Sequence, residues 1–390
     1  MPHALIAPFN LPSLPARLGE DTFEFISTPH KGSGIVGVRH DDDRFLLKYL
    51  QRDGNVLVKS DKTTRIPKLN VLKKAINHFC ELTGSEVLRT NTAVNKKDRV
   101  YSNYKDLDFF LEACDYSKTI WVEVGFGSGR HLLHNAKNHP DIIHIGLEIH
   151  KPSAEQVLKQ CELQGIDNLY VLDFDARIFL EILPANSVQK IFVHFPVPWD
   201  KAPHRRVISK GFVDEAVTVL EPGGTLELRT DSENYMFYSY GVFMELSSAE
   251  LMVRKNHFLE VSSKYEDRWK KMNKNFYDLT LTNHLESEKK TFNPDFSFEG
   301  FVPFEEFAER LAGKAIVETD YLIGAKERYP LGHGEGLLKI TMGAFGTPQS
   351  LYLLFRDNTV VYYPRTPYPT GASLKAHNRL QAMIHGTDNR

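Results

Sequence analysis

Three alternating glycines follow an apolar run that contains an acid, and this pattern suggests a cofactor turn. Glu123 precedes Gly125, Gly127 and Gly129 in the segment that ends at Arg130. Glycines allow a tight turn and close approach of a ligand, and the next helix points free N–H groups at it. A carboxylate there suits the ammonium of S-adenosylmethionine (SAM). A nicotinamide dinucleotide is disfavoured, because the acid repels its pyrophosphate and Arg130 occupies the last glycine position of G-x-G-x-x-G.

Two more acids end apolar runs farther along the chain. Glu148 follows residues 142–147, about nineteen residues after the last glycine, where an acid grips ribose hydroxyls. Asp175, with Ala176 next to it, ends a third run and is placed to accept from an adenine amino group. Three acids at successive strand ends predict a nucleoside cofactor across the carboxyl edge of a parallel sheet.

A stiff aromatic loop and a basic cluster follow the fourth apolar run. The segment Phe195-Pro196-Val197-Pro198-Trp199 contains two prolines, which fix the backbone beside the cofactor edge. We expect Trp199 to stack on a base and the cations after it to meet phosphates. These cations are Lys201, Arg205, Arg206 and Lys210.

Two other basic regions are candidate RNA contacts or plain solvated surface. One runs from Lys264 to Lys271, with Lys274 after it. The other lies in the N-terminal region and contains Lys59, Lys62, Arg65, Lys68, Lys73 and Lys74.

Alternating strand and helix signals must position these residues. We expect strands at 119–127, 142–149, 168–175, 188–195 and 224–230, and helices near 129–138, 153–164, 210–220 and 233–247. Glu221-Pro222-Gly223-Gly224 is expected to form a turn before the fifth strand. Two final strands, near 258–265 and 276–283, have no helical segment between them and should pair antiparallel. The prediction is a doubly wound, mostly parallel, seven-stranded Rossmann-like sheet.

The flanks have β-type patterns. Asp53-Gly54 separates two apolar runs as a hairpin turn, and a helix is expected at about 69–82. A second hairpin is expected at 351–363, whereas the tail after Pro364 looks turn-rich and polar. We expect an N-terminal β-rich or α+β extension at 1–100, the α/β domain at 101–285 and a C-terminal β-rich extension at 286–390. The ends either join in one domain or form two small ones.

Composition sets outer limits. The chain has 390 residues, which suggests two or three domains, and a net charge of −2, so nucleic-acid contact requires local patches. The three cysteines form no C-x-x-C pair, which predicts a reducing compartment and no structural metal. No apolar run approaches twenty residues and no basic-then-apolar leader is visible, so we expect a cytoplasmic protein without a membrane partner.

These motifs together resemble the tRNA (guanine-N7)-methyltransferase family over roughly residues 118–285. The matching elements are E-x-G-x-G-x-G at Glu123, G-x-E ending at Glu148, Asp175-Ala176, P-x-P-W-x-K ending at Lys201, Thr230-Asp231, and Ser263-Lys264-Tyr265-Glu266. The resemblance implies that Lys201, Asp231, Ser263 and Glu266 face the target nucleotide. It also implies methylation of the variable-loop guanine of tRNA, with SAM as cofactor.

One position departs from the family pattern. Val197 stands where the family has an aspartate regarded as catalytic. Guanine N7 carries a lone pair and no proton, so methyl transfer needs alignment rather than a general base. Asp231 and Glu266 are the candidates to orient the guanine and offset its developing charge. The alternatives are an RNA-binding protein that lost turnover and a methyltransferase for a small molecule or protein.

Overall fold

The computed structural model describes residues 1–63, 68–94, 99–257, 274–288, 294–313 and 315–387. Contacts divide the chain into two compact units. Met1–Arg99 and Asn293–Arg390 make up one unit, and Val100–Phe292 make up the other. Within the described residues no helix combines the length and apolarity needed to cross a membrane.

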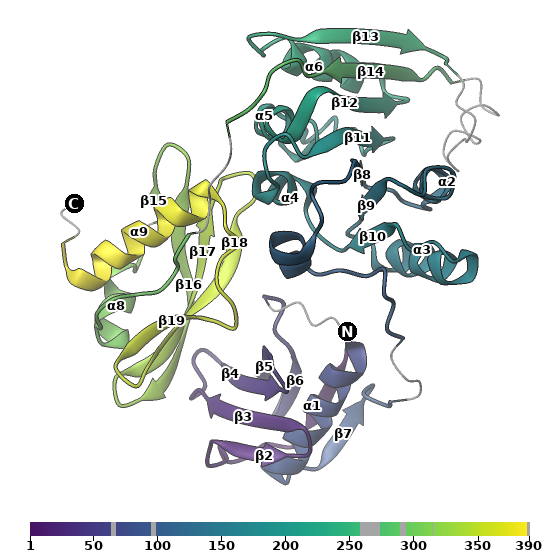
Figure 1. Ribbon diagram of the computed structural model, residues 1–390. Helices are drawn as coiled ribbons and strands as arrows, with labels where there is room; N and C mark the ends of the chain where they lie inside the picture. The colour runs from purple at the N-terminus through teal and green to yellow at the C-terminus, as the bar shows by residue number, and fades with distance from the viewer. Residues whose placement is uncertain (64–67, 95–98, 258–273, 289–293, 314, 388–390) are drawn as a thin grey trace. The chain divides into compact units, whose positions relative to one another are not determined.

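The central unit contains one seven-stranded sheet with the order β10-β9-β8-β11-β12-β14-β13 (Figure 1). The first five strands in this order pair in parallel, whereas β14 runs antiparallel to both β12 and β13. Strand order reverses between β8 and β11, which makes their carboxyl ends a ligand-binding switch point. The strands are β8 (Ile120–Val124), β9 (Ile143–Leu147), β10 (Leu169–Leu172), β11 (Val188–His194), β12 (Leu220–Thr230), β13 (Glu250–Lys255) and β14 (Tyr277–Thr282).

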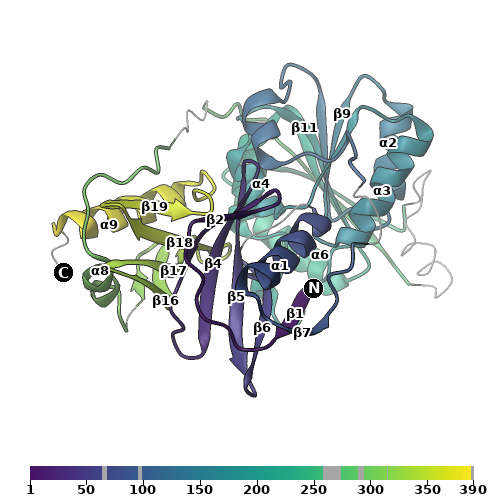
Figure 2. The ribbon, with the colours of Figure 1, turned by 90° about the horizontal axis from the view of Figure 1, so that it is seen from below.

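Helices cover both faces of this sheet (Figures 1 and 2). α2 (Arg130–Asn138) and α3 (Lys151–Gln164) lie on one face; α4 (Ala176–Ile182), α5 (Lys210–Val219) and α6 (Glu233–Phe243) lie on the other. Every residue of β8 and β9 is buried, as expected for central parallel strands. Side-chain caps begin three helices, because Asp175, Ser209 and Ser232 accept from backbone N–H groups of the first turn. A short π-helix, Phe109–Ala113, precedes β8, and a 3-10 turn, Pro203–Arg205, precedes α5.

Two predictions about the later strands need correction. The strand predicted near 258–265 lies outside the described residues, and the strands that pair with β14 are β12 and, on its other side, β13 at Glu250–Lys255. The turn predicted at Glu221–Gly224 lies inside β12, which starts at Leu220 directly after α5. The β11–β12 register shifts between Val188 and Lys190, so residues 221–224 of β12 bulge out of the pairing. Gly223 and Gly224 therefore lie in an irregular part of a strand rather than in a turn before it.

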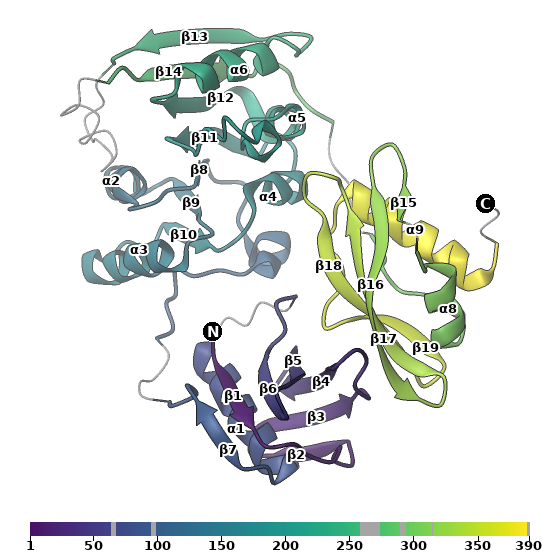
Figure 3. The same cartoon turned by 180° about the vertical axis from the view of Figure 1, so that it is seen from behind.

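The N-terminal part of the other unit is a seven-stranded antiparallel sheet with one helix, α1 (Leu69–Thr83), packed on β1 and β6 (Figure 3). Asp53 and Gly54 turn β5 into β6, as predicted. The sheet order is β2-β3-β4-β5-β6-β1-β7. Its strands are β1 (His3–Ile6), β2 (Ala16–Leu18), β3 (Asp21–Ile26), β4 (Ser33–His40), β5 (Asp43–Arg52), β6 (Asn55–Ser60) and β7 (Val87–Thr90).

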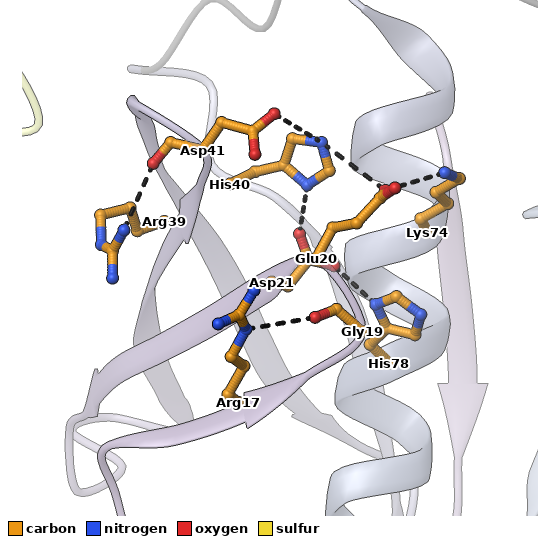
Figure 4. Close-up of polar contacts among 9 residues, drawn as sticks. All are labelled: Arg17, Gly19, Glu20, Asp21, Arg39, His40, Asp41, Lys74 and His78. Atoms are coloured by element: carbon orange, nitrogen blue, oxygen red, sulfur yellow. Dashed lines mark hydrogen bonds and ion pairs between the residues drawn. The ribbon is translucent and has the colours of Figure 1, made fainter.

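A buried carboxylate ties this sheet to α1 (Figure 4). Asp21 is fully buried, and its two oxygens lie 2.7 Å from Nδ1 of His40 and 2.7 Å from Nδ1 of His78. His40 ends β4 and His78 lies on α1. These contacts with two histidines compensate the cost of burying the Asp21 carboxylate.

The C-terminal part of the same unit is a five-stranded antiparallel sheet, β15 to β19 in sequence order. The hairpin of β18 and β19 was predicted, but the tail is not irregular, because α9 (Gly371–His385) is a helix of fifteen residues. Buried Leu380, Met383 and Ile384 supply its apolar face and Thr370 caps it, a pattern that the polar residues between them obscure. The elements are α8 (Phe304–Arg310), β15 (Ile316–Val317), β16 (Leu322–Gly332), β17 (Glu335–Gly343), β18 (Gln349–Arg356) and β19 (Thr359–Tyr363).

The two terminal sheets share a core. Residues of β17 and β18 alternate between a cluster under α8 and α9 and a second cluster that includes Phe25, Ile35 and Leu46 of the N-terminal sheet. Beside this second cluster, Nζ of Lys48 lies 2.5 Å from a Glu327 carboxylate oxygen. The ends of the sequence therefore build one unit through packed apolar residues and a cross-sheet ion pair.

Candidate active site at the carboxyl edge of the sheet

The three glycines of the turn after β8 have different structural roles. All have positive φ, at 69° for Gly125, 53° for Gly127 and 69° for Gly129. A Cβ on Gly125 or Gly127 would meet no atom within 4 Å, whereas one on Gly129 would lie 2.2 Å from the Val157 side chain. The first two glycines therefore leave space above the sheet edge, and the third allows α2 and α3 to pack closely.

Glu148 is fixed beside this turn. One carboxylate oxygen accepts from the Gly127 N–H at 2.9 Å, and the other accepts from the His150 N–H at 2.9 Å. A carboxylate has about four acceptor sites, so two hydrogen bonds from the backbone leave capacity for a diol. The second strand-end acid thus lies in contact with the glycine turn, as a ribose ligand must.

Asp175 lies at the end of the third predicted run and begins α4. Its carboxylate accepts from the Arg177 N–H at 3.0 Å and from two guanidinium nitrogens of the same residue at 3.0 and 2.6 Å. This bidentate pair raises the pKa of Arg177. Ala176 beside it is buried. Asp175 therefore serves as a helix cap in addition to its predicted role toward adenine.

Glu123 is buried at the end of β8 and has a partner that the sequence analysis did not identify. Its carboxylate lies 2.7 Å from Nδ1 of His131 on α2. A second pair lies next to it, with Nε2 of His194 2.7 Å from a carboxylate oxygen of Glu227. The two imidazole rings are 4.5 Å apart. Register places Glu123, Phe192 and Glu227 side by side, so the cluster occupies the face covered by α2.

A signal for this cluster is present in the sequence, although weak. In β11 and β12 polar residues alternate with apolar ones, at His194, Glu227 and Arg229. Arg229 is 1% exposed, and its guanidinium lies 2.6 Å from the Asp278 carboxylate of β14. Alternation in a central parallel strand, which is normally apolar throughout, indicates a polar network on one face.

The loop after β11 has an unusual backbone. Phe195 and Trp199 have φ values of 50° and 45°, a region that residues other than glycine rarely occupy. Val197 between them is 61% exposed, and Trp199 is 38% exposed. The Arg205 guanidinium lies 4.9 Å from the Trp199 ring centroid. The loop thus presents apolar and aromatic side chains to solvent beside a cation.

The basic residues of this loop divide into two groups. Lys201, Arg205 and Lys210 are exposed, and Lys210 is paired with Asp214 on its own helix at 2.8 Å. Arg206 is only 7% exposed and donates to the Pro198 carbonyl at 2.7 Å. Of the cations predicted to meet phosphates, Lys201 and Arg205 are therefore exposed and Arg206 is buried.

Asp231 follows β12 at the same edge of the sheet. Its side chain is 21% exposed, and a carboxylate oxygen lies 3.6 Å from Nζ of Lys274. Ser263 and Glu266, together with the basic run from Lys264 to Lys271, lie outside the described residues.

The basic residues of the N-terminal region differ in exposure. Lys62 and Lys68 are exposed, Lys59, Lys73 and Lys74 are partly buried, and Arg65 lies outside the described part of the chain.

This edge fits the chemistry of SAM. Open space above Gly125 and Gly127 admits a ligand against the main chain, Glu148 has acceptor sites for a diol, and Glu123 provides a buried carboxylate for an ammonium. The stiff loop after β11 and Asp231 after β12 lie at the carboxyl ends of neighbouring strands. A nucleoside cofactor and a planar substrate can therefore meet at this edge.

Such a sheet edge, with an acid before a glycine turn, defines a class of α/β enzymes that bind a nucleoside cofactor. A family model described as "Putative methyltransferase" matches residues 117–279. A tRNA (guanine-N(7)-)-methyltransferase of Wolinella succinogenes is 36% identical, and the alignment covers 98% of this chain and all of that protein. The enzyme of the same name from Helicobacter pylori strain J99 is 37% identical over 98% of this chain and 97% of that protein. The chain therefore belongs to the tRNA (guanine-N(7)-)-methyltransferase family.

Among solved structures, the chain is similar to the 16S rRNA methyltransferase KamB. The sequences are 18% identical with a TM-score of 0.36, and the match covers 47% of this chain and 95% of that chain.

Proposed function

We propose that this protein transfers the methyl group of SAM to N7 of a guanine in tRNA, and that the guanine is the one in the variable loop. The observation that carries this proposal is the meeting of two loops at one sheet edge. The glycine turn with Glu148 provides the cofactor side, and the P-x-P-W loop with Asp231 provides the substrate side. The near-full-length relatives carry the same activity in their names.

The fold supports this assignment at a coarser level. We interpret the seven-stranded sheet as a doubly wound methyltransferase sheet, with its two antiparallel strands at one end. The β-rich terminal regions are interpreted as flanking extensions of that catalytic domain. A methyltransferase for a small molecule or protein is the weaker alternative, because it leaves the apolar-aromatic loop and the exposed cations beside it without a role.

The cofactor side holds the methyl donor in place. Glu123 faces the ammonium, Glu148 accepts from the ribose hydroxyls, and Asp175 beside Ala176 accepts from the adenine amino group. The turn of Gly125, Gly127 and Gly129 lets the methionine part approach the main chain. SAM supplies an electrophilic methyl group on a sulfonium, which needs no activation by a metal.

The substrate side aligns the guanine. Trp199 stacks on the base, Lys201 and Arg205 contact phosphates, and Asp231 faces the nucleotide. The family resemblance assigns the same role to Ser263 and Glu266, which lie outside the described residues. The N7 lone pair forms the new bond to the methyl carbon while the sulfur–carbon bond breaks toward sulfur. N7 carries no proton in the reactant, so these residues supply alignment and charge stabilisation rather than proton transfer.

The direct test uses the intact protein, isotopically labelled SAM and unmodified tRNA transcripts. Label should enter tRNA, and reduction followed by aniline treatment should cleave the strand at a single variable-loop position. A transcript with adenine at that position is the matched control and should accept no label. If the protein binds SAM and tRNA without incorporation, it is a binding protein that lost turnover, the alternative that Val197 raises.

A further inference from the structure

The side chain of Arg206 packs against the P-x-P-W loop after β11 and does not face solvent. The side chain is 7% exposed. Its Nε donates to the Pro198 carbonyl at 2.7 Å, and a terminal nitrogen lies 3.3 Å from a carboxylate oxygen of Asp200. Both partners flank Trp199, so one guanidinium holds the loop on either side of the exposed indole.

The same guanidinium packs on α6. Its central carbon lies 4.4 Å from the ring centroid of Tyr238 and 5.1 Å from that of Tyr235. Tyr235 is fully buried, and its hydroxyl accepts from the Ile208 N–H at 3.0 Å. Because α6 begins just after Asp231, Arg206 connects the loop after β11 to the loop after β12.

The backbone of the P-x-P-W loop requires such support. Phe195 and Trp199 both have positive φ, and side-chain-bearing residues hold this conformation only when their surroundings fix it. The Phe195 N–H donates to the Arg229 carbonyl at 2.6 Å, which fixes the start of the loop. At the other end, the Arg206 side chain bonds to the residues before and after Trp199.

We propose that Arg206 is a positioning residue for methyl transfer and does not contact tRNA phosphates. It holds Trp199 and Asp231 in one arrangement around the target base, so that the base lies in line with the methyl group. This inference rests on the proposed function. A lysine can replace it only in part, because the planar guanidinium donates hydrogen bonds and stacks on a ring at the same time.

The test compares R206A and R206K with R205A, whose exposed cation lies beside the same indole. Single-turnover rates at saturating tRNA, tRNA dissociation constants over a salt series, and SAM affinity by calorimetry are measured for each protein. In R206A the saturated rate should fall by up to about a hundredfold, the scale expected for misplacement by about 1 Å. Its salt slope and SAM affinity should match those of the wild type. R206K should recover only part of the rate, and R205A should flatten the salt slope.

A second readout follows the loop itself. In a W121F/W269F background, acrylamide quenching reports on Trp199, and R206A should increase that quenching. If R206A fails to fold, Y238A removes the stacking partner while the arginine remains, and it should lower the saturated rate.

Two results overturn the proposal. One is a flatter salt slope in R206A with an unchanged saturated rate, which is the behaviour of a phosphate contact. The other is a wild-type rate in R206K and Y238A. Absence of m7G formation by the wild-type protein on every transcript is a separate outcome that refutes the proposed function.

Discussion

The Glu123 carboxylate and the His131 imidazole form a buried pair, with 2.7 Å between the oxygen and Nδ1. Burial alone would lower the pKa of His131, but the nearby Glu123 carboxylate, with Glu227, raises it above its ordinary value. Burial likewise favours neutral Glu227, yet His194 and His131 lower the pKa of that carboxyl. The acid proposed for the SAM ammonium therefore already has a titratable partner in the free protein.

SAM affinity should depend on pH through His131. An ammonium beside Glu123 repels a protonated imidazole, so SAM binding should lower the raised pKa and release a proton. SAM affinity is then weak at low pH, rises as the pH increases toward the pKa of His131 in the SAM-free protein, and levels off above that pKa. Calorimetry from pH 5.5 to 8.5, in buffers of different ionisation enthalpy, measures both the affinity and the released proton.

The control for this effect is His131→Asn, which keeps a donor near Glu123 without a titrating ring. Other groups face His131 as well, namely His194, Glu227 and Arg229 from the sheet and Asn135 from α2. A pH dependence that persists unchanged in the asparagine variant would assign the effect to them.

Glu148 and Asp175 should each contribute to SAM binding. Glu148→Gln keeps one oxygen for the Gly127 N–H, and Asp175→Asn keeps a good helix cap, so both variants should fold. Loss of a charge-assisted hydrogen bond costs about 1.5–3 kcal/mol, or roughly a tenfold to hundredfold weaker affinity. Calorimetry gives the affinity and thermal unfolding the stability. Wild-type affinity in both variants would refute the cofactor site.

The exposed cations of the substrate loop should set the salt dependence of tRNA binding. Lys201→Ala and Arg205→Ala together should weaken binding and reduce the slope of log K against log salt by about one to two, since each lost phosphate contact removes about 0.7–0.9. SAM affinity should be unaffected. Lys210→Ala is the matched control, because Asp214 already neutralises Lys210. An equal slope in the double variant and the control would show that Lys201 and Arg205 do not contact phosphates.

Substitutions at Val197 and at the two candidate acids test whether alignment of the guanine, rather than proton transfer, accounts for the rate of methyl transfer. Val197→Ala should change the single-turnover rate by less than about threefold, because no proton transfer is lost. Asp231→Ala or Glu266→Ala should slow it by at least about tenfold, with SAM affinity preserved, as expected for interactions made with the reacting base. Restoring the family acid with Val197→Asp should give no gain, because it adds negative charge at a sheet edge that already carries Asp231 after the neighbouring strand. Full activity in both alanine variants of the acids would mean that other groups orient the guanine.

The N-terminal basic residues test whether the terminal unit binds the tRNA body. Lys62 and Lys68 are exposed, whereas Lys74 is paired with Glu20 at 2.9 Å. Substitution of Lys62 and Lys68 by alanine should weaken tRNA binding about threefold to tenfold and leave SAM binding alone. Lys74→Ala should have a smaller effect. Point substitutions are preferable to deletion of residues 1–100, because Phe25 and Ile35 form part of a core shared with the C-terminal sheet.

Local sequence patterns determined much of the central unit. Apolar runs with helical spacing between them placed β8 to β12 and the helices α2, α3, α5 and α6 within a few residues, because buried parallel strands such as β8 and β9 need little beyond continuous apolar character. The short helix α4, directly after Asp175, was not predicted. The acid and glycines after β8 likewise indicated a cofactor turn, since only glycine takes these φ values at low cost. The edge strand β13 was not predicted, because its apolar run, 251–253, is only three residues long and the strand is mostly exposed.

Only the tertiary structure decided which polar groups meet. Glu123 and His131 are eight residues apart, but His194 and Glu227 join them through strand register, which a single sequence does not reveal. The same holds for Arg206, a basic residue expected at a phosphate, whose burial against Tyr238 depends on the packing of α6. The union of the two chain ends is also a tertiary result, because apolar faces far apart in the sequence find each other by shape and burial rather than by any local signal.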